Sequence, residues 1–464
     1  MHMKKILAFL LFLLCVPAYS AQVVNVEYIH NAIAQKWDIT IPYNPALANP
    51  RVAANMKYLL TVVDVANEML NGGKTTDYGN GEYATMIAAD TVATDGAVDN
   101  LVKSIDWHFF IKTTDDTTGF SLKISAKGTF YVNWGDGTIE TINKQDVENI
   151  TYSHTYAESG AYDISIAGRA TAYSNVSKTA AISFAGNKKL AQISGSLGAI
   201  FPTISSKSQP RFYQTFSNCT MLEGGIPENL FNGVSGKPAS TMFVGLFANC
   251  GKLTGSIPEN LFAGLSGAPS YQLFNNTFLN CSGLTGPIPG KLFAGISGSP
   301  TEYLFDSTFS GCSGLSGEIP ADLFRGITGT PLYGVFYRTF SGCGGLTGAI
   351  PENLFSGIYG TPSGGMFYYT FFGCKGLTSI PENLFGDISG TAKTAMFAGM
   401  FSGCTGLQGE SAKINGRYLY NIWPDAISTQ VDDMYYNATG LDDYNCIPSS
   451  WGGGGKNCLA TDPT

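Results

Sequence analysis

Apolar and polar positions in the C-terminal half of this 464-residue chain repeat at a fixed interval. The motif Phe-x-x-Cys-x-x-Leu occurs seven times, at intervals of 31 residues except for a last interval of 30. A unit of about thirty residues cannot bury its own apolar face, so successive units must stack and place equivalent side chains in columns. The three columns contain Phe216, Phe247, Phe278, Phe309, Phe340, Phe371 and Phe401; Cys219, Cys250, Cys281, Cys312, Cys343, Cys374 and Cys404; and Leu222, Leu253, Leu284, Leu315, Leu346, Leu377 and Leu407.

Local signals within one unit, residues 330–360, predict its elements. Thr330–Pro331 is typical of a helix start and Ser341–Gly342 of a helix end. Phe336 and Phe340 lie four residues apart, hence on one face of that helix. Residues 346–350 form a short extended run, and the proline that follows opens a second helical turn. The sequence therefore predicts a solenoid over residues 184–445, with one short parallel strand and two helical pieces in each repeat.

Both ends of the array carry degraded copies of the motif. Phe184 to Leu190 matches the first full copy with asparagine in the cysteine position. Met434 to Leu441 matches the last copy with alanine there. Atypical terminal units are expected as caps, which gives about nine coils.

The chain before the repeats falls into two further regions. Residues 51–70 carry apolar side chains at helical spacing within a region, 21–103, in which we identify no chemistry. Residues 104–183 show short alternating strands at 109–111, 120–124, 129–132 and 162–166. The predicted class is thus a multidomain α+β protein: a small N-terminal α/β region, an immunoglobulin-like β-sandwich, and the solenoid, followed by a tail at 446–464.

Motifs in the predicted sandwich suggest a family. Trp-Gly-Asp-Gly-Thr at 134–138 is followed by His154-Thr155-Tyr156 and by Gly160-Ala161-Tyr162. These motifs resemble the PKD (polycystic kidney disease) family of extracellular domains over about eighty residues. The resemblance implies an immunoglobulin-like spacer. Asp136 offers one carboxylate, and a calcium site needs six to eight oxygens, so a turn-forming role is favoured over calcium binding.

The repeats suggest a second family. Phe340-Ser341-Gly342-Cys343-Gly344-Gly345-Leu346 resembles the BspA-like leucine-rich repeats of bacterial surface proteins, and residues 346–351 are similar to the strand of plant-type leucine-rich repeats. The resemblance implies a secreted or surface-attached adhesive role, in many members towards host or matrix proteins. The Gly-x-Pro linkers and the long period depart from the family pattern, so the partner is not carried over.

Export and charge narrow the function classes. Residues 1–20 contain Lys4 and Lys5, then an apolar run, then small residues typical of a cleavage site, which predicts a secretory signal peptide. A membrane anchor is the alternative, but the apolar run falls short of the roughly twenty residues that span a bilayer. The net charge of −8 becomes −10 without Lys4 and Lys5, which argues against a nucleic-acid partner. No downstream apolar run has membrane-spanning length.

The cysteines divide into two groups. In-register side chains on neighbouring coils lie farther apart than a disulfide prefers, so the seven repeat cysteines are interpreted as buried thiols near backbone carbonyls rather than as disulfides. A column also spreads ligands along an axis, which argues against a metal site. Cys446 and Cys458 lie outside the column, with eleven residues between them, and are predicted to form a disulfide.

Catalytic signals are weak and binding signals are stronger. No metal-spaced histidine pair and no G-x-S-x-G turn is found, so no catalytic residue, metal or cofactor is assigned. Tyr271, Tyr303 and Tyr333 stand at variable positions on a constant framework, where they are candidate ligand-binding residues or unconstrained surface. The sequence favours a secreted or cell-surface bacterial adhesion protein that binds an extracellular or host protein, or a glycan, without catalysis. A structural envelope or matrix component is the alternative.

Overall fold

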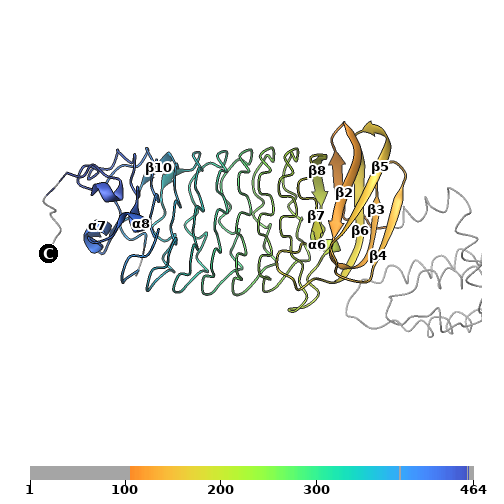
Figure 1. The fold of residues 1–464 in the computed structure, drawn as a ribbon, viewed down its shortest axis with the longest axis horizontal. Helices are drawn as coiled ribbons and strands as arrows, with labels where there is room; N and C mark the ends of the chain where they lie inside the picture. Colours follow the sequence, from red (N-terminus) through yellow and green to blue (C-terminus); the bar gives the residue numbers. More distant parts are fainter. Residues whose placement is uncertain (1–104, 386–387, 457, 459–464) are drawn as a thin grey trace, which may run out of the picture. The chain divides into compact units, whose positions relative to one another are not determined.

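The computed structural model describes residues 105–385, 388–456 and 458, and the chain from Ile105 onward forms one compact unit (Figure 1). The predicted signal peptide and the predicted region 21–103, including its helix, lie outside the described residues. Within the described ranges, no helix is long and apolar enough to cross a membrane.

Two antiparallel sheets begin the unit, and they fit the predicted immunoglobulin-like sandwich. Side chains alternate along the strands: in β1, Phe109, Ile111 and Thr113 are buried, whereas Phe110 and Lys112 are exposed. One sheet has the order β4-β3-β6-β1-β8 and the other the order β5-β2-β7. The strands are β1 (Phe109–Thr113), β2 (Thr117–Ile124), β3 (Lys127–Asn133), β4 (Ile139–Lys144), β5 (Ile150–Gly160), β6 (Asp163–Ala172), β7 (Ile182–Ser183) and β8 (Leu190–Gly195).

The sandwich and the repeats share one hydrophobic core. Strands β7 and β8 flank the degraded first copy of the motif, and they pair with β2 and β1 respectively. The ring of Phe184 lies 5.9 Å from that of Phe109 in the sandwich and 5.5 Å from that of Phe216 in the first full repeat. The degraded copy therefore covers the end of the stack by joining it to both sheets.

The helix predicted at 330–342 is wrong. Gly334, Arg338 and Gly342 have φ values of 64°, 51° and 75°, and a right-handed helix cannot include a positive φ at every fourth residue. The backbone instead makes successive turns, and we call this segment of each repeat the turn run. The backbone N–H groups alternate between two kinds of acceptor. One set donates to the carbonyl three residues earlier in the same repeat: Tyr337, Thr339, Ser341 and Cys343. The other set donates to carbonyls of the next repeat: Gly334, Phe336, Arg338, Phe340 and Gly342.

The predicted fold class is also wrong for the repeat region, because the described residues between 201 and 412 form neither helices nor a continuous parallel sheet. Neighbouring repeats pair mostly through single parallel bridges, such as Gly317 with Leu346 and Gly329 with Ile358. One pair of repeats extends this to two short strands, β9 (Thr347–Ala349) and β10 (Gly376–Ser379). The turn runs already supply the hydrogen bonds between repeats that a parallel sheet would supply.

Aromatic columns run through the stacked turn runs. The first column extends from Phe184 through the seven motif phenylalanines to Tyr435, with successive ring centroids 5.2 to 6.0 Å apart. A second column starts at Phe212 and a third at Phe231, and rings of the third lie tilted against the second. Equivalent side chains of successive repeats therefore occupy equivalent places, as the sequence period predicts.

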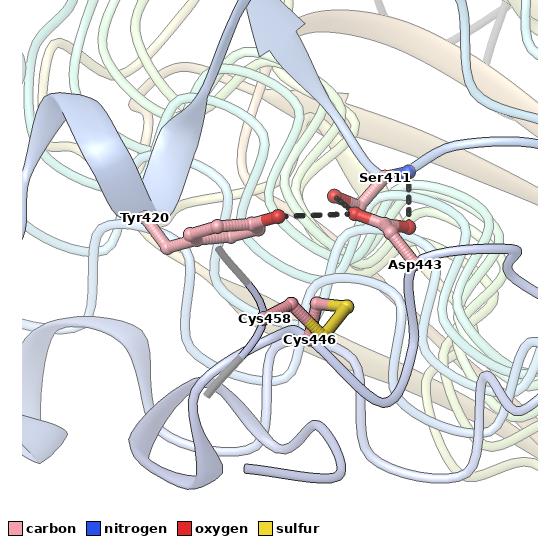
Figure 2. The surroundings of a disulfide bond; sticks show 5 residues. All are labelled: Ser411, Tyr420, Asp443, Cys446 and Cys458. Carbon is pink, nitrogen blue, oxygen red and sulfur yellow. Dashed lines mark hydrogen bonds between the residues drawn. A yellow bond between two sulfur atoms is a disulfide. The ribbon is translucent and has the colours of Figure 1, made fainter. Parts of the chain in front are cut away.

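The C-terminal end of the stack is closed by a cap with short elements. Figure 2 shows the carboxylate of Asp443 accepting hydrogen bonds from the N–H of Ser411 at 2.9 Å, its hydroxyl at 2.6 Å, and the hydroxyl of Tyr420 at 3.3 Å. The predicted disulfide between Cys446 and Cys458 is present beside this network. The cap elements are β11 (Lys413–Ile414), β12 (Arg417–Tyr418), α7 (Leu419–Ile422), α8 (Ser428–Val431) and a 3₁₀ turn, η1 (Ser449–Trp451); α6 (Leu197–Ile200) lies near the sandwich.

Candidate binding surface

The three tyrosines proposed from sequence lie on turn runs of consecutive repeats. Tyr271 and Tyr333 each expose 42% of their surface, and Tyr303 between them is half-buried. The rings of Tyr303 and Tyr333 are 5.3 Å apart and tilted by 59°. The structure thus brings Tyr303 and Tyr333 into contact, whereas Tyr271 makes no ring contact with either.

Glycines of the next repeat accommodate these rings. A Cβ added at Gly334 would lie 2.9 Å from the ring of Tyr303, and one added at Gly364 would lie 3.0 Å from the ring of Tyr333. The tyrosines therefore lean along the stack onto the following repeat. Part of the sequence variation at Tyr303 and Tyr333 has a packing cause, because the glycine one period later leaves room for each ring.

A larger aromatic cluster, which the sequence analysis missed, continues from Tyr333. The added Cβ at Gly365 would lie 3.4 Å from both the Tyr333 and the Tyr337 rings, so these two rings flank one glycine. Tyr337 stacks on Tyr368 at 4.5 Å, and Tyr368 meets Tyr369 edge to face at 4.4 Å. The sequence carries a signal for this contact, because Tyr337 and Tyr368 are one period apart and thus occupy equivalent positions of neighbouring repeats.

Arg338 stands within this cluster. Its guanidinium carbon lies 5.4 Å from the centre of the Tyr337 ring and 5.5 Å from the centres of the Tyr368 and Tyr369 rings, which is the range of cation–π attraction. Phe372, 40% exposed, extends the cluster at 5.0 Å from Tyr369. We call the whole set the tyrosine strip: Tyr271, Tyr303, Tyr333, Tyr337, Arg338, Tyr368, Tyr369 and Phe372.

The strip combines phenols with one cation, Arg338, whose charge also acts on the nearby carboxyl group of Asp306. Burial raises the pKa of Tyr337 to about 12, although the charge of Arg338 opposes this rise. Burial also raises the pKa of Asp306 to about 6, against the opposing effects of a hydrogen bond from Ser307, the charge of Arg338 and a hydrogen bond from Asn275. Burial also raises the pKa values of Tyr303 and Tyr369, so these two phenols and that of Tyr337 are not ionised at neutral pH.

The motif residues of the sandwich converge on one turn. Asp136 accepts a hydrogen bond from the N–H of Thr138 at 2.9 Å, and its other oxygen lies 2.7 Å from Nε2 of His154. The imidazole of His154 stacks on Trp134 with centroids 5.2 Å apart, and the Tyr156 hydroxyl donates to the Trp134 carbonyl at 2.8 Å. One oxygen of Asp136 is thus engaged within the turn and the other by His154 on strand β5. Across the described residues, no group of three metal-binding side chains gathers.

The seven repeat cysteines are free and buried. Each thiol donates to the carbonyl of a phenylalanine in the preceding copy of the motif, at 2.9 to 3.1 Å. Burial raises the thiol pKa throughout the column, to about 12 at Cys312. These thiols are therefore unreactive packing groups that satisfy carbonyls between repeats.

Comparison with protein-family models, curated proteins and solved structures finds no match for this chain.

Proposed function

We propose that this chain is an exported, non-catalytic binding protein of the bacterial surface or surroundings, and that the tyrosine strip contacts its extracellular partner. The observation that carries the proposal is the continuity of partly exposed aromatic side chains from Tyr303 to Phe372, around Arg338, on stacked repeats. Tyrosine and arginine are the residue types enriched where binding energy concentrates in protein interfaces. The export signal and the resemblance to surface repeat proteins agree with this reading.

A protein partner is favoured over a glycan by how the rings are arranged. Pyranose rings bind aromatic side chains by lying on an exposed ring face. Tyr337 and Tyr368 already cover one face of each other, and the guanidinium of Arg338 lies over both. The cluster thus mixes apolar ring surface, phenol hydroxyls and a cation, which suits the mixed polar and apolar surface of a protein.

The backbone of the strip is rigid, which lowers the cost of binding. Turn-run N–H groups on both sides of Arg338 donate either within the repeat or to the next repeat. Side chains held on such a framework lose little freedom when a partner docks. The strip therefore needs few strong contacts for specific attachment.

Attachment of the full chain to surfaces coated with collagen, laminin or fibronectin, beside a glycan array, tests the proposal. Replacing Tyr271, Tyr303 and Tyr333 together by alanine should weaken attachment to a protein at least tenfold, because each loss at an interface centre costs about 1 kcal/mol or more. Tyr359→Ala is the matched control, since Tyr359 is 52% exposed but lies outside the turn run. It should leave attachment unchanged.

Three results would count against the proposal. Unchanged attachment of the triple variant, with a normal melting curve, would remove the strip as the binding surface. Strip-dependent binding to glycans but to no protein would reverse the choice of partner class. Absence of attachment to every surface would favour a structural component of an envelope or matrix.

A further inference from the structure

A second surface feature, separate from the tyrosine strip, gathers positive charge in a cavity. The cavity has a volume of about 280 Å³ and is lined by nine residues. Three of them are cationic, Lys207, Arg211 and Lys237, and none is acidic. The remaining lining includes Asn175, Ser206, Gln209 and Ser240, whose side chains offer hydrogen bonds. Such a lining is unusual in a chain with a net charge of −8.

Three segments that are distant in sequence build this cavity. Residues 174 and 175 follow the last long strand of the sandwich. Ser205 and Ser208 exchange backbone hydrogen bonds in a tight hairpin that carries Ser206 and Lys207 at its tip. Residues 237–240 lead into the turn run of the following repeat. The side chain of Gln209 donates to the carbonyl of Lys237, which ties the second segment to the third.

Arg211 is held in a fixed position at the cavity. Its Nε donates to the carbonyl of Ser240 at 3.0 Å and its Nη1 to the carbonyl of Ser174 at 2.8 Å. Within the described part of the chain, no carboxylate forms an ion pair with Arg211, Lys207 or Lys237. Desolvation lowers the pKa of Arg211, as expected for a half-buried charge that lacks a nearby anion. The guanidinium therefore has its orientation set by the protein while its charge is not neutralised by it.

We propose that this cavity binds a tetrahedral oxyanion, namely a sulfate or phosphate group. A fixed guanidinium with two flexible ammonium groups matches the charge and the hydrogen-bonding capacity of such an anion. The acidic remainder of the protein does not oppose binding strongly, because at physiological ionic strength charges more than about 8 Å away are largely screened. The sulfate or phosphate group belongs either to a free ion or to a larger anionic molecule, and a sulfated polymer distinguishes these two sources.

Thermal unfolding of the full chain tests the site, with sodium sulfate, sodium phosphate and sodium chloride compared at equal ionic strength. Sulfate or phosphate should raise the melting temperature above that in chloride, with a saturating dependence on concentration. Dextran sulfate compared with uncharged dextran identifies the source. If dextran sulfate stabilises the protein at a much lower concentration of sulfate groups than sodium sulfate does, the natural ligand is a larger anionic molecule. If the two concentrations of sulfate groups are equal, the natural ligand is the free ion.

The variant Lys207→Gln with Lys237→Gln removes two of the three charges. Both lysines are exposed and form no ion pair with described residues, so folding should not depend on their side chains. The concentration of anion needed for half-maximal stabilisation should rise at least tenfold. The control, Lys112→Gln with Lys375→Gln, changes the net charge equally at exposed positions away from the cavity and should match the unmodified protein. An equal response of both variants, or no stabilisation of the unmodified protein beyond chloride, would overturn the proposal.

Discussion

Two adjacent glycines, Gly344 and Gly345, provide a matched test of how closely the repeats approach one another. A Cβ added at Gly345 would lie 2.4 Å from the carbonyl oxygen of Leu315 and 3.0 Å from that of Ser313, both in the preceding repeat. A Cβ added at Gly344 would meet nothing closer than the carbonyl oxygen of Gly373 at 3.9 Å. Neither glycine has a positive φ. Alanine is therefore allowed by the backbone at both positions, and only the contact differs.

The cost of Gly345→Ala follows from this geometry. Because the obstacle is backbone, the two repeats must separate locally, and overpacking of this kind costs about 1–3 kcal/mol. The separation also weakens the hydrogen bond from the N–H of Thr347 to the carbonyl of Gly317, at 2.9 Å, which adds about 0.5–1.5 kcal/mol. The expected destabilisation is about 1.5–4.5 kcal/mol. Gly344→Ala should be neutral or stabilise by up to about 1 kcal/mol, because alanine restricts the unfolded chain.

Urea unfolding, followed by circular dichroism and by tryptophan fluorescence, measures both variants against the unmodified chain. The buried Trp451 reports on the capped end of the stack. Gly345→Ala should lower the urea midpoint clearly, and Gly344→Ala should not lower it. Equal midpoints for the two variants would refute the close backbone approach of neighbouring repeats.

Two further predictions concern the sandwich and the cap. Burial raises the pKa of Asp136, but the hydrogen bonds from His154 and Thr138 lower it by more, so the net shift is downward. Asp136→Ala should therefore lower the melting temperature by its full amount above about pH 4. The difference between the variant and the unmodified chain should fade as the pH falls below that value. A loss that instead grows in acid would contradict this role. Cys446→Ser should destabilise the cap by about 3 kcal/mol, since the disulfide with Cys458 closes a loop of about a dozen residues; reductant should lower the melting temperature of the unmodified chain and not that of the variant.

The stacking of the repeats could be predicted from the sequence because the period itself encodes it. Phenylalanine, cysteine and leucine return at one interval, and only equivalent packing of each unit explains this regularity. The structure places the phenylalanines in a continuous column and the cysteines beside it. The degraded copies also close the stack, with Phe184 contacting the sandwich and Tyr435 stacking on Phe401.

The local conformation of each repeat could not be predicted in the same way. Phe336 and Phe340 lie four residues apart, and that spacing puts side chains on one face in a helix and also in a run of four-residue turns. The feature that separates the two is the left-handed conformation of Gly334, Arg338 and Gly342. Glycine permits that conformation, but arginine gives no signal for it.

The candidate sites were only partly visible in the sequence for a related reason. Tyr303 and Tyr333 were identified because they stand at variable positions, whereas Tyr337 and Arg338 were overlooked because they fall inside the supposed helix. Lys207 and Lys237 line the same cavity only because the hairpin at 205–208 folds against the segment 237–240 of the next repeat. No local motif records that proximity.

The central claim is that consecutive repeats stack in register with a buried column of free thiols. Alkylation by iodoacetamide, with each modified cysteine located by peptide mass spectrometry, tests it most directly. In the native protein, Cys281 and Cys312 in the middle of the column should stay unmodified, because they are fully buried and their thiol pKa values are raised. All seven repeat cysteines should react in denaturant without any reductant. Rapid native labelling of Cys281 or Cys312, or a disulfide between repeat cysteines, would contradict the account.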